Sequence, residues 1–342
     1  MRYLWLDGLR GVAAAYVVMF HLIGRTNNFA QFGWLSVDLF FVLSGFVLCR
    51  SISDSYADGW CGRNSFIRKR IARLFPMLFL ALLLVLVVNF IEFAKELITG
   101  DSGTSAAFTP ETPLYYLLAL VLLQFVYPIS STLLIPLWSL SAEFYSNLIS
   151  LYLGFNTTIR RILYGLISGF LLICLSGLWL DLGLDWSSYK TWIFGFGRAF
   201  LGFSIGQIVW KCYSYRFEFT GRFLALLFTI TFGTTWATWI FARHFMLIST
   251  LIFISLIIFI LAKWPSPDPG NRLHAILKTL GETSYGVYLL HPSLLKLVVP
   301  LTNLQGFWLF VVSYLFILFA SSLFTKYLEP VVKSRILRLL KL

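Results

Sequence analysis

The sequence predicts an all-α polytopic membrane protein with about ten transmembrane helices. The 342 residues are 58% hydrophobic and only 12% charged, and their mean hydropathy of +0.81 is too high for the surface of a soluble domain. Apolar stretches of about 20 residues, long enough to cross a bilayer as a helix, recur along the whole chain with short polar connections. We therefore expect residues 1–342 to form a single transmembrane domain without a fused soluble domain.

The expected spans follow one another closely along the chain. They lie roughly at residues 9–24, 34–50, 71–92, 133–154, 162–180, 191–210, 222–241, 245–263, 283–300 and 307–327. The first lacks a small-residue cleavage site and carries both acidic and basic residues, so we expect it to be retained rather than removed as a signal peptide. Residues 114–127 are also apolar, but this segment is short and bounded by Pro113 and Pro128, which favours an interfacial or re-entrant piece.

Basic residues are distributed unevenly between the two sides of this arrangement. With ten spans, 20 of the 27 Lys and Arg residues fall on the side that carries both termini. The positive-inside rule therefore predicts a multi-pass protein of the inner (plasma) membrane with both termini in the cytoplasm. Topology alone explains the net charge of +12, so the charge does not indicate a nucleic-acid partner.

The four cysteines, Cys49, Cys61, Cys174 and Cys212, have no metal-ligand spacing, and none falls in a predicted outer loop. We expect free thiols and no metal site. The sequence also lacks a phosphate-binding P-loop and a dinucleotide fingerprint.

The first span carries ionisable side chains, which are costly inside a membrane. Arg10 and His21 are eleven residues apart, which places them about 20° from eclipsed on a helix and about 16 Å apart along its axis. Asp7 lies near the same face. Arg10 could simply extend its side chain to the membrane surface, and His21 could form an ordinary interhelical hydrogen bond. Their common face favours a joint role.

Two carboxylates are expected at a depth similar to that of His21. Asp38 lies near the start of the second span, and Glu143 lies on a polar face of the fourth. Carboxylates beside an imidazole would orient it as a general base. Alternatively, one of them could pair with Arg198, and the sequence does not decide between these arrangements.

A basic run, FIRKRIARLFP at residues 66–76, precedes the third predicted span. Arg70 and Arg73 share a helical face there and could bind the phosphates of a donor together with Arg68. The alternative is that topology or anionic lipids explain the run. In the ninth span, Ser284, Tyr288 and His291 form a further polar stripe, which we expect to point inward.

Taken in order, five segments resemble the membrane-bound acyltransferase 3 family. They are LDGLRGVAA with its arginine ten residues before FHL, SVDLFFVLSGFVL (36–48), the basic run that ends at Pro76, PLWSLSAEFY (136–145) and TSYGVYLLHP (283–292). The resemblance covers nearly the whole chain. It implies ten helices that transfer an acyl group, usually acetyl, from cytoplasmic acyl-CoA to a hydroxyl of an extracytoplasmic carbohydrate such as a polysaccharide, lipopolysaccharide or lipo-oligosaccharide.

The chain departs from the family pattern at several positions. Lys69 stands where some members have an arginine, which would weaken bidentate phosphate binding there. Phe144 and Tyr145 replace the usual second glutamate and a glutamine. We also expect the periplasmic hydrolase-like domain of some members to be absent, so the chain would complete the transfer itself or pass the acyl group to a separate periplasmic partner.

Together these features give a mechanistic hypothesis. The phosphates of acyl-CoA, most simply acetyl-CoA, would bind near four arginines, Arg10, Arg68, Arg70 and Arg73. The pantetheine arm would extend along the first span to His21, which would act as general base or transient acyl carrier, with Glu143 or Asp38 orienting it. The alternative function is a transporter or flippase that uses intramembrane His, Asp and Glu residues, although no inverted repeat is visible.

Overall fold

The computed structural model describes residues 3–24, 26, 27, 29–99, 112–123, 136–152, 158–179, 192–215, 229 and 246–339. All regular secondary structure in these ranges is helical, which confirms the predicted all-α class. Except for residue 229, the span predicted at 222–241 lies outside the described residues. Most of residues 93–132, the segment between the third and fourth predicted spans that the predicted topology places outside, also lies outside the described residues.

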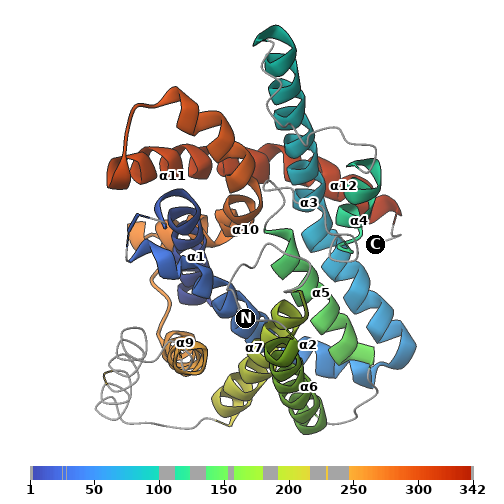
Figure 1. Ribbon diagram of the computed structural model, residues 1–342. Helices are drawn as coiled ribbons and strands as arrows, with labels where there is room; N and C mark the ends of the chain where they lie inside the picture. Colours follow the sequence, from blue (N-terminus) through green and yellow to red (C-terminus); the bar gives the residue numbers. More distant parts are fainter. Residues whose placement is uncertain are drawn as a thin grey trace.

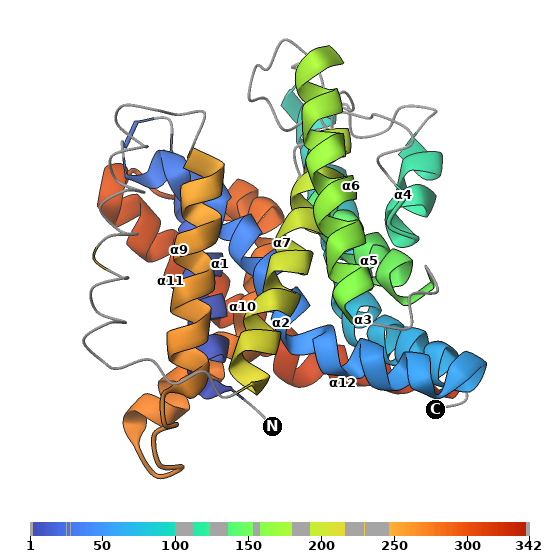
Figure 2. The ribbon, with the colours of Figure 1, turned by 90° about the horizontal axis from the view of Figure 1, so that it is seen from below.

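Eleven α-helices are present in the described ranges. They are α1 (Leu4–Ile23), α2 (Ser36–Ala57), α3 (Gly59–Thr99), α4 (Thr112–Leu120), α5 (Leu137–Tyr152), α6 (Thr158–Trp179), α7 (Trp192–Ser214), α9 (Met246–Lys263), α10 (Arg272–Val298), α11 (Gly306–Leu323) and α12 (Glu329–Leu339). Figure 1 shows how they are arranged in the bundle, with the last turns of α3 extending past the other helices. Figure 2 shows that α1 begins at the end of the bundle along which α12 and the first turns of α3 lie. We call this end the terminal face and the opposite end the far face.

Several of these helices have the length and composition of membrane spans. Five stretches in the described ranges are long and apolar enough to cross a bilayer: Leu4–Ile23, Ala30–Ala57, Gly59–Thr99, Ile193–Ser214 and Gly306–Leu339. A shorter apolar helix covers Leu247–Lys263. The prediction of multiple membrane helices is therefore confirmed, whereas the count of about ten is not. Helix α5, for example, coincides with the predicted fourth span but has only 16 residues.

Two helices begin well before the predicted spans. Helix α3 runs from Gly59 to Thr99, so the basic run 66–76 lies inside it and not ahead of it. Helix α10 begins at Arg272, about three turns before the predicted span at 283–300. Hydropathy marks only the apolar part of a helix, whereas the backbone hydrogen bonds continue through its polar turns. This explains why both starts were predicted too late.

Helices α1 and α10 pack side by side over much of their length, as both views show. Gly11 permits this close approach, because an added Cβ would lie 2.5 Å from the Cβ of Leu280 and 2.8 Å from its carbonyl oxygen. Farther along the same interface, the rings of His21 and His291 lie 5.1 Å apart. The two helices therefore run in the same direction, away from the terminal face.

Helices α2 and α7 form a second close pair. A side chain at Gly45 would meet the backbone carbonyl of Phe203, and one at Gly206 would meet that of Val42. Small residues bring helix backbones together in membranes, where the hydrophobic effect does not drive helix association. This pair carries Asp38 on α2, which was predicted to be functional, and opposite it, on α7, Arg198, which was its alternative partner.

Large apolar side chains are exposed on the outside of several helices. Phe90 on α3, Phe170 on α6 and Phe319 on α11 are 62%, 62% and 63% exposed. Such surfaces are too apolar for water and suit contact with lipid tails. They support the membrane environment predicted from composition.

Candidate active site

Asp38 and Arg198 form a buried ion pair. The Nε and Nη2 atoms of Arg198 donate to the two carboxylate oxygens of Asp38 at 2.9 and 2.5 Å, and the side chains are 1% and 0% exposed. The guanidinium carbon also lies 4.9 Å from the ring centre of Trp34. This is the alternative that the sequence left open for Asp38, and it makes the residue part of the packing between α2 and α7.

Glu143 is held by a different pair of side chains. Its Oε1 accepts hydrogen bonds at 2.8 Å from both Nη2 of Arg70 on α3 and the hydroxyl of Ser44 on α2. Glu143 is one-fifth exposed and Arg70 one-tenth. One carboxylate oxygen therefore joins α2, α3 and α5, and one of the predicted phosphate-binding arginines already has an anionic partner.

The expected contact between a carboxylate and His21 is absent from the described part of the chain. Neither Asp38 nor Glu143 has a hydrogen bond or ion pair with His21 there; each binds an arginine instead. The predicted depth of Glu143 explains part of this error. Ser139, one helical turn before Glu143 on α5, already reaches the level of Tyr288, and His291 lies three residues farther from the terminal face. Glu143 thus lies about 10 Å closer to the terminal face than His291 and His21 do, too far for contact with His21.

Three arginines gather near the terminal face. The charge of Arg73 on α3 acts on Arg10 of α1, as do those of Arg70 and Glu143. Within the described residues, the side chains of Arg10 and Arg73 have no hydrogen bond or ion pair, and both are at least partly accessible. Arg68, the fourth predicted donor-binding residue, is partly exposed in the same stretch of α3. Two guanidinium groups brought together without a hydrogen-bonded anion form a site suited to phosphate.

His21 lies near the far end of α1, in contact with a second histidine. Its imidazole is exposed, and it lies edge to face with Phe20 and 5.1 Å from the ring of His291. His291 is fully buried, and its Nδ1 lies 2.8 Å from the carbonyl oxygen of Tyr288. Its Nε2 has no hydrogen-bond partner in the described ranges. Two imidazoles thus meet at one level, where a carboxylate and an imidazole were expected.

A hydroxyl pair lies beside these histidines. The hydroxyls of Tyr288 and Ser139 are 2.5 Å apart, and Ser139 donates to the carbonyl of Pro136. The ring centre of Tyr288 is 6.2 Å from that of His291. These bonds fix α5 against α10 and hold the polar stripe of α10 inward, as its spacing predicts.

The comparison with known protein families gives a match along almost the whole length of this architecture. A family model described as an acyltransferase domain, that of the acyltransferase 3 family, matches residues 3–327. The chain belongs to the acyltransferase 3 family. This confirms the resemblance seen in the five motifs, and it favours the acyltransferase over the transporter or flippase.

Individual relatives of this acyltransferase cover different parts of it. A Staphylococcus aureus (strain COL) protein named "Putative O-acetyltransferase" is 28% identical over 322 residues, 87% of this chain and 52% of the relative. A Rhizobium radiobacter protein named "Protein 2 in picA locus" is 32% identical over 47% of this chain and 86% of the relative. A Bacillus subtilis (strain 168) protein named "Putative peptidoglycan O-acetyltransferase" is 36% identical over 29% of this chain and 16% of the relative. The chain thus spans about half the length of the staphylococcal protein. No solved structure matches it.

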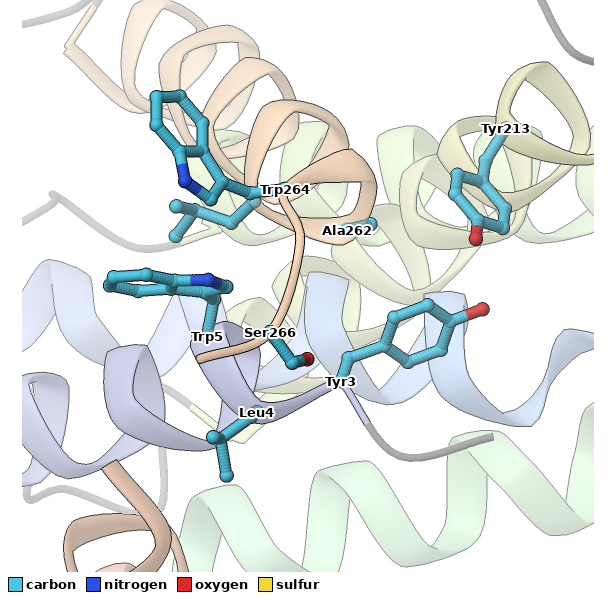
Figure 3. A pocket seen from close by; sticks show the side chains of 8 residues that line it. Tyr3, Leu4, Trp5, Tyr213, Ala262, Trp264 and Ser266 are labelled. Atoms are coloured by element: carbon cyan, nitrogen blue, oxygen red, sulfur yellow. The ribbon is translucent and has the colours of Figure 1, made fainter. Parts of the chain in front are cut away.

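A separate cavity of about 170 Å³ lies at the terminal face of the acyltransferase. Figure 3 shows its aromatic lining, with Trp5 and Trp264 to one side of Ser266 and with Tyr3 and Tyr213 to the other. None of the predicted site residues lines it. Sites for ligands of drug size usually enclose about 300–1,000 Å³, so we do not place the acyl donor there.

Among the described residues, no cluster of three or more His, Cys, Asp or Glu side chains could hold a metal ion. The four cysteines are free thiols.

Sequence reasoning did not assign roles to His291, Ser44 or Tyr285. The first was visible as part of an inward stripe, but its contact with His21 depends on which faces of α1 and α10 meet. Ser44 gave no signal beyond its place in the second motif. Tyr285 donates to the backbone carbonyl of Leu74 at 2.9 Å, which anchors α10 to the basic stretch of α3.

Proposed function

We propose that this acyltransferase moves an acetyl group from acetyl-CoA, bound at the terminal face, to a carbohydrate hydroxyl at the far face. We place the terminal face in the cytoplasm and the far face outside it, because the basic last turns of α7 and α9, the basic start of α10 and the basic stretch of α3 lie at the terminal face. The observation that carries the proposal is that one stretch of α10 brings Arg10 and Arg73 together: its Gly281 packs against Asp7 of α1, and its Tyr285 donates to the carbonyl of Leu74 on α3. Both arginines are at least partly accessible.

The arginine cluster suits the phosphates of the donor. The carboxylates of Glu143 and Asp7 act on Arg10 and oppose the repulsion from Arg73, and bidentate bonds to phosphate oxygens would satisfy both guanidinium groups further. Arg68 would add charge at the entrance. Because Arg70 already binds Glu143, we assign it mainly to fixing the shape of the site, with its charge as a secondary contribution.

Helix α1 would guide the rest of the donor. Arg10 and His21 lie on one unbroken helix, about 16 Å apart along its axis. For the thioester to reach the exposed imidazole of His21, an extended pantetheine arm that starts at the arginine cluster would have to part the packing of Ala14, Val17 and Val18, which are buried on the same face of α1. The chemistry would then take place nearer the far face than the site of donor binding.

In the transfer step, His21 acts as general base. It takes the proton of the acceptor hydroxyl while the hydroxyl oxygen forms a bond to the thioester carbonyl carbon. The carbon–sulfur bond then breaks, and the CoA thiol leaves with the proton returned by the imidazolium. In the alternative route, His21 first carries the acetyl group on its own nitrogen and then passes it to the hydroxyl or to a separate partner at the far face.

The class of acceptor is proposed from the relatives. Two of them carry names that specify O-acetyl transfer, one of them to peptidoglycan. A carbohydrate hydroxyl, in a polysaccharide, a lipopolysaccharide or another glycolipid, is therefore the acceptor class that we propose for this chain.

A label-transfer assay tests this function. Membranes containing the wild-type protein, incubated with radiolabelled acetyl-CoA and candidate glycans, are expected to give labelled glycan with an alkali-labile ester. His21→Ala should lower the rate of labelling by about 100-fold or more, the value of a general base, whereas His274→Ala should not, because His274 binds the carbonyl of Pro267 in the connection to α10. Absence of labelled glycan with every acceptor, or full activity of the His21→Ala variant, would contradict the proposal.

A further inference from the structure

An imidazole that works as a general base needs an acceptor for the N–H of its other nitrogen. This acceptor fixes the tautomer and the ring orientation and stabilises the imidazolium that forms. For His21 the expected acceptors were Asp38 and Glu143. Both are bound elsewhere, Asp38 through both oxygens to Arg198 and Glu143 to Arg70 and Ser44.

His291 has an acceptor of the kind that His21 lacks within the described part of the chain. Because its Nδ1 lies 2.8 Å from the carbonyl oxygen of Tyr288, we assign the ring proton to Nδ1, which donates this bond. The lone pair is then on Nε2. That atom is buried, in a side chain that is 0% exposed, and it has no partner in the described ranges. A buried acceptor without a partner is unfavourable, so its environment favours a donor.

The two rings are placed for this interaction. Their centroids are 5.1 Å apart and their planes are inclined by 32°, on two helices locked together by glycine contacts. The proposed bond requires a rotation of the accessible His21 side chain about its own bonds, which leaves both helices in place. Catalytic hydrogen bonds are often long in the absence of substrate and tighten when it binds.

We propose that His291 is the positioning residue for His21: its Nε2 accepts the N–H of His21 and so presents the other nitrogen of His21 to the acceptor hydroxyl. During transfer His21 gains the hydroxyl proton and becomes an imidazolium that donates to His291. His291 itself gains and loses no proton. This inference rests on the proposed acetyl transfer, and it adds a residue with a defined role to that reaction.

Two substitutions separate this role from a structural one. His291→Gln keeps an amide oxygen near the position of Nε2, whereas His291→Asn keeps an amide nitrogen near Nδ1 that still donates to the carbonyl of Tyr288. Positioning of His21 predicts that the Gln variant retains kcat within about tenfold of wild type and that the Asn variant loses about 100-fold, at similar KM for acetyl-CoA. A purely structural bond to Tyr288 predicts the reverse order.

Two controls keep the result interpretable. His274 also places Nδ1 near a backbone carbonyl, that of Pro267, at 3.0 Å, and is a matched site where the same two substitutions should leave kcat unchanged. If His291 acts through His21, then His291→Asn should add no further loss to whatever transfer remains in His21→Ala. This cycle still decides the question if both His291 variants lower the amount of folded protein, since kcat is measured per folded enzyme.

The outcomes are distinct. A higher kcat in His291→Gln than in His291→Asn supports the proposal, provided that His291→Asn lowers the activity of His21→Ala no further. The proposal would be overturned if His291→Asn had a kcat equal to or higher than that of His291→Gln. It would also be overturned if the losses from His291→Asn and His21→Ala were additive. If the wild-type protein transfers no acetyl group to any acceptor, the proposed function fails before the role of His291 is reached.

Discussion

The buried pair between Asp38 and Arg198 allows a direct test of whether Asp38 supports the fold or the chemistry. The perturbation is Asp38→Asn, which removes the negative charge and keeps the size of the side chain. Arg198 is 1% exposed, so its guanidinium would remain buried without the carboxylate that accepts two of its hydrogen bonds. Removing one partner of such a pair costs about 3–5 kcal/mol.

That cost is large relative to the stability of a typical domain, roughly 5–15 kcal/mol. The matched variant, Asp38→Leu with Arg198→Met, removes both charges, and replacement of a whole buried pair by apolar side chains is often close to neutral. We therefore expect the single variant to unfold at a clearly lower temperature than wild type and the double variant to recover most of the difference. Thermal unfolding of the purified protein in detergent measures both.

The same two variants decide whether Asp38 has a catalytic role. Because Asp38 does not contact His21, the double variant should keep acetyl transfer per folded molecule within a few-fold of wild type. A double variant that folds normally but transfers no acetyl group would refute this reasoning and return Asp38 to the catalytic role first expected of it. Unchanged stability in Asp38→Asn would refute the structural role.

Three further results are expected. Arg73→Ala should raise KM for acetyl-CoA by about tenfold or more, which is the value of one charged hydrogen bond. Lys69→Ala, which changes an exposed neighbour, should leave KM unchanged. Equal KM in both variants would mean that the basic cluster serves membrane topology and does not bind the donor. Glu143→Gln should lower the free energy of unfolding by about 1–3 kcal/mol, because it weakens the bonds to Arg70 and Ser44. It should reduce acetyl transfer per folded molecule less than His21→Ala does. Loss of transfer in a Glu143→Gln variant of unchanged stability would show that Glu143 is catalytic. A reporter fused at residue 105 should be extracytoplasmic, and a cytoplasmic signal there would contradict the predicted topology.

The sequence predicted those features that depend on a single helix. The helical class, the membrane-like apolar stretches and the placement of Arg10 and His21 on one unbroken helix follow from hydropathy and from the 3.6-residue period. Hydropathy was less informative about helix length, since the polar turns of α3 and α10 are helical without being apolar.

The sequence could not predict which side chains pair across helices. Asp38 had two plausible partners, His21 and Arg198, and the choice depends on the rotation of α2 against α7, which Gly45 and Gly206 fix through backbone contact. Likewise, His291 was recognised as part of a stripe, but its neighbour is set by the register of α10 on α1. Pairings of this kind depend on helix rotation and depth, to which composition and periodicity are insensitive.

The central claim is that the acetyl group enters at the terminal face and is transferred near the far face. Sealed vesicles of defined orientation test it most directly, with radiolabelled acetyl-CoA supplied on one side and the glycan acceptor on the other. We expect labelled glycan only when acetyl-CoA is on the side of the terminal face and the acceptor on the side of the far face, and a rate lower by about 100-fold or more with His21→Ala. Labelling only when donor and acceptor share one side, or only with donor at the far face, would contradict it.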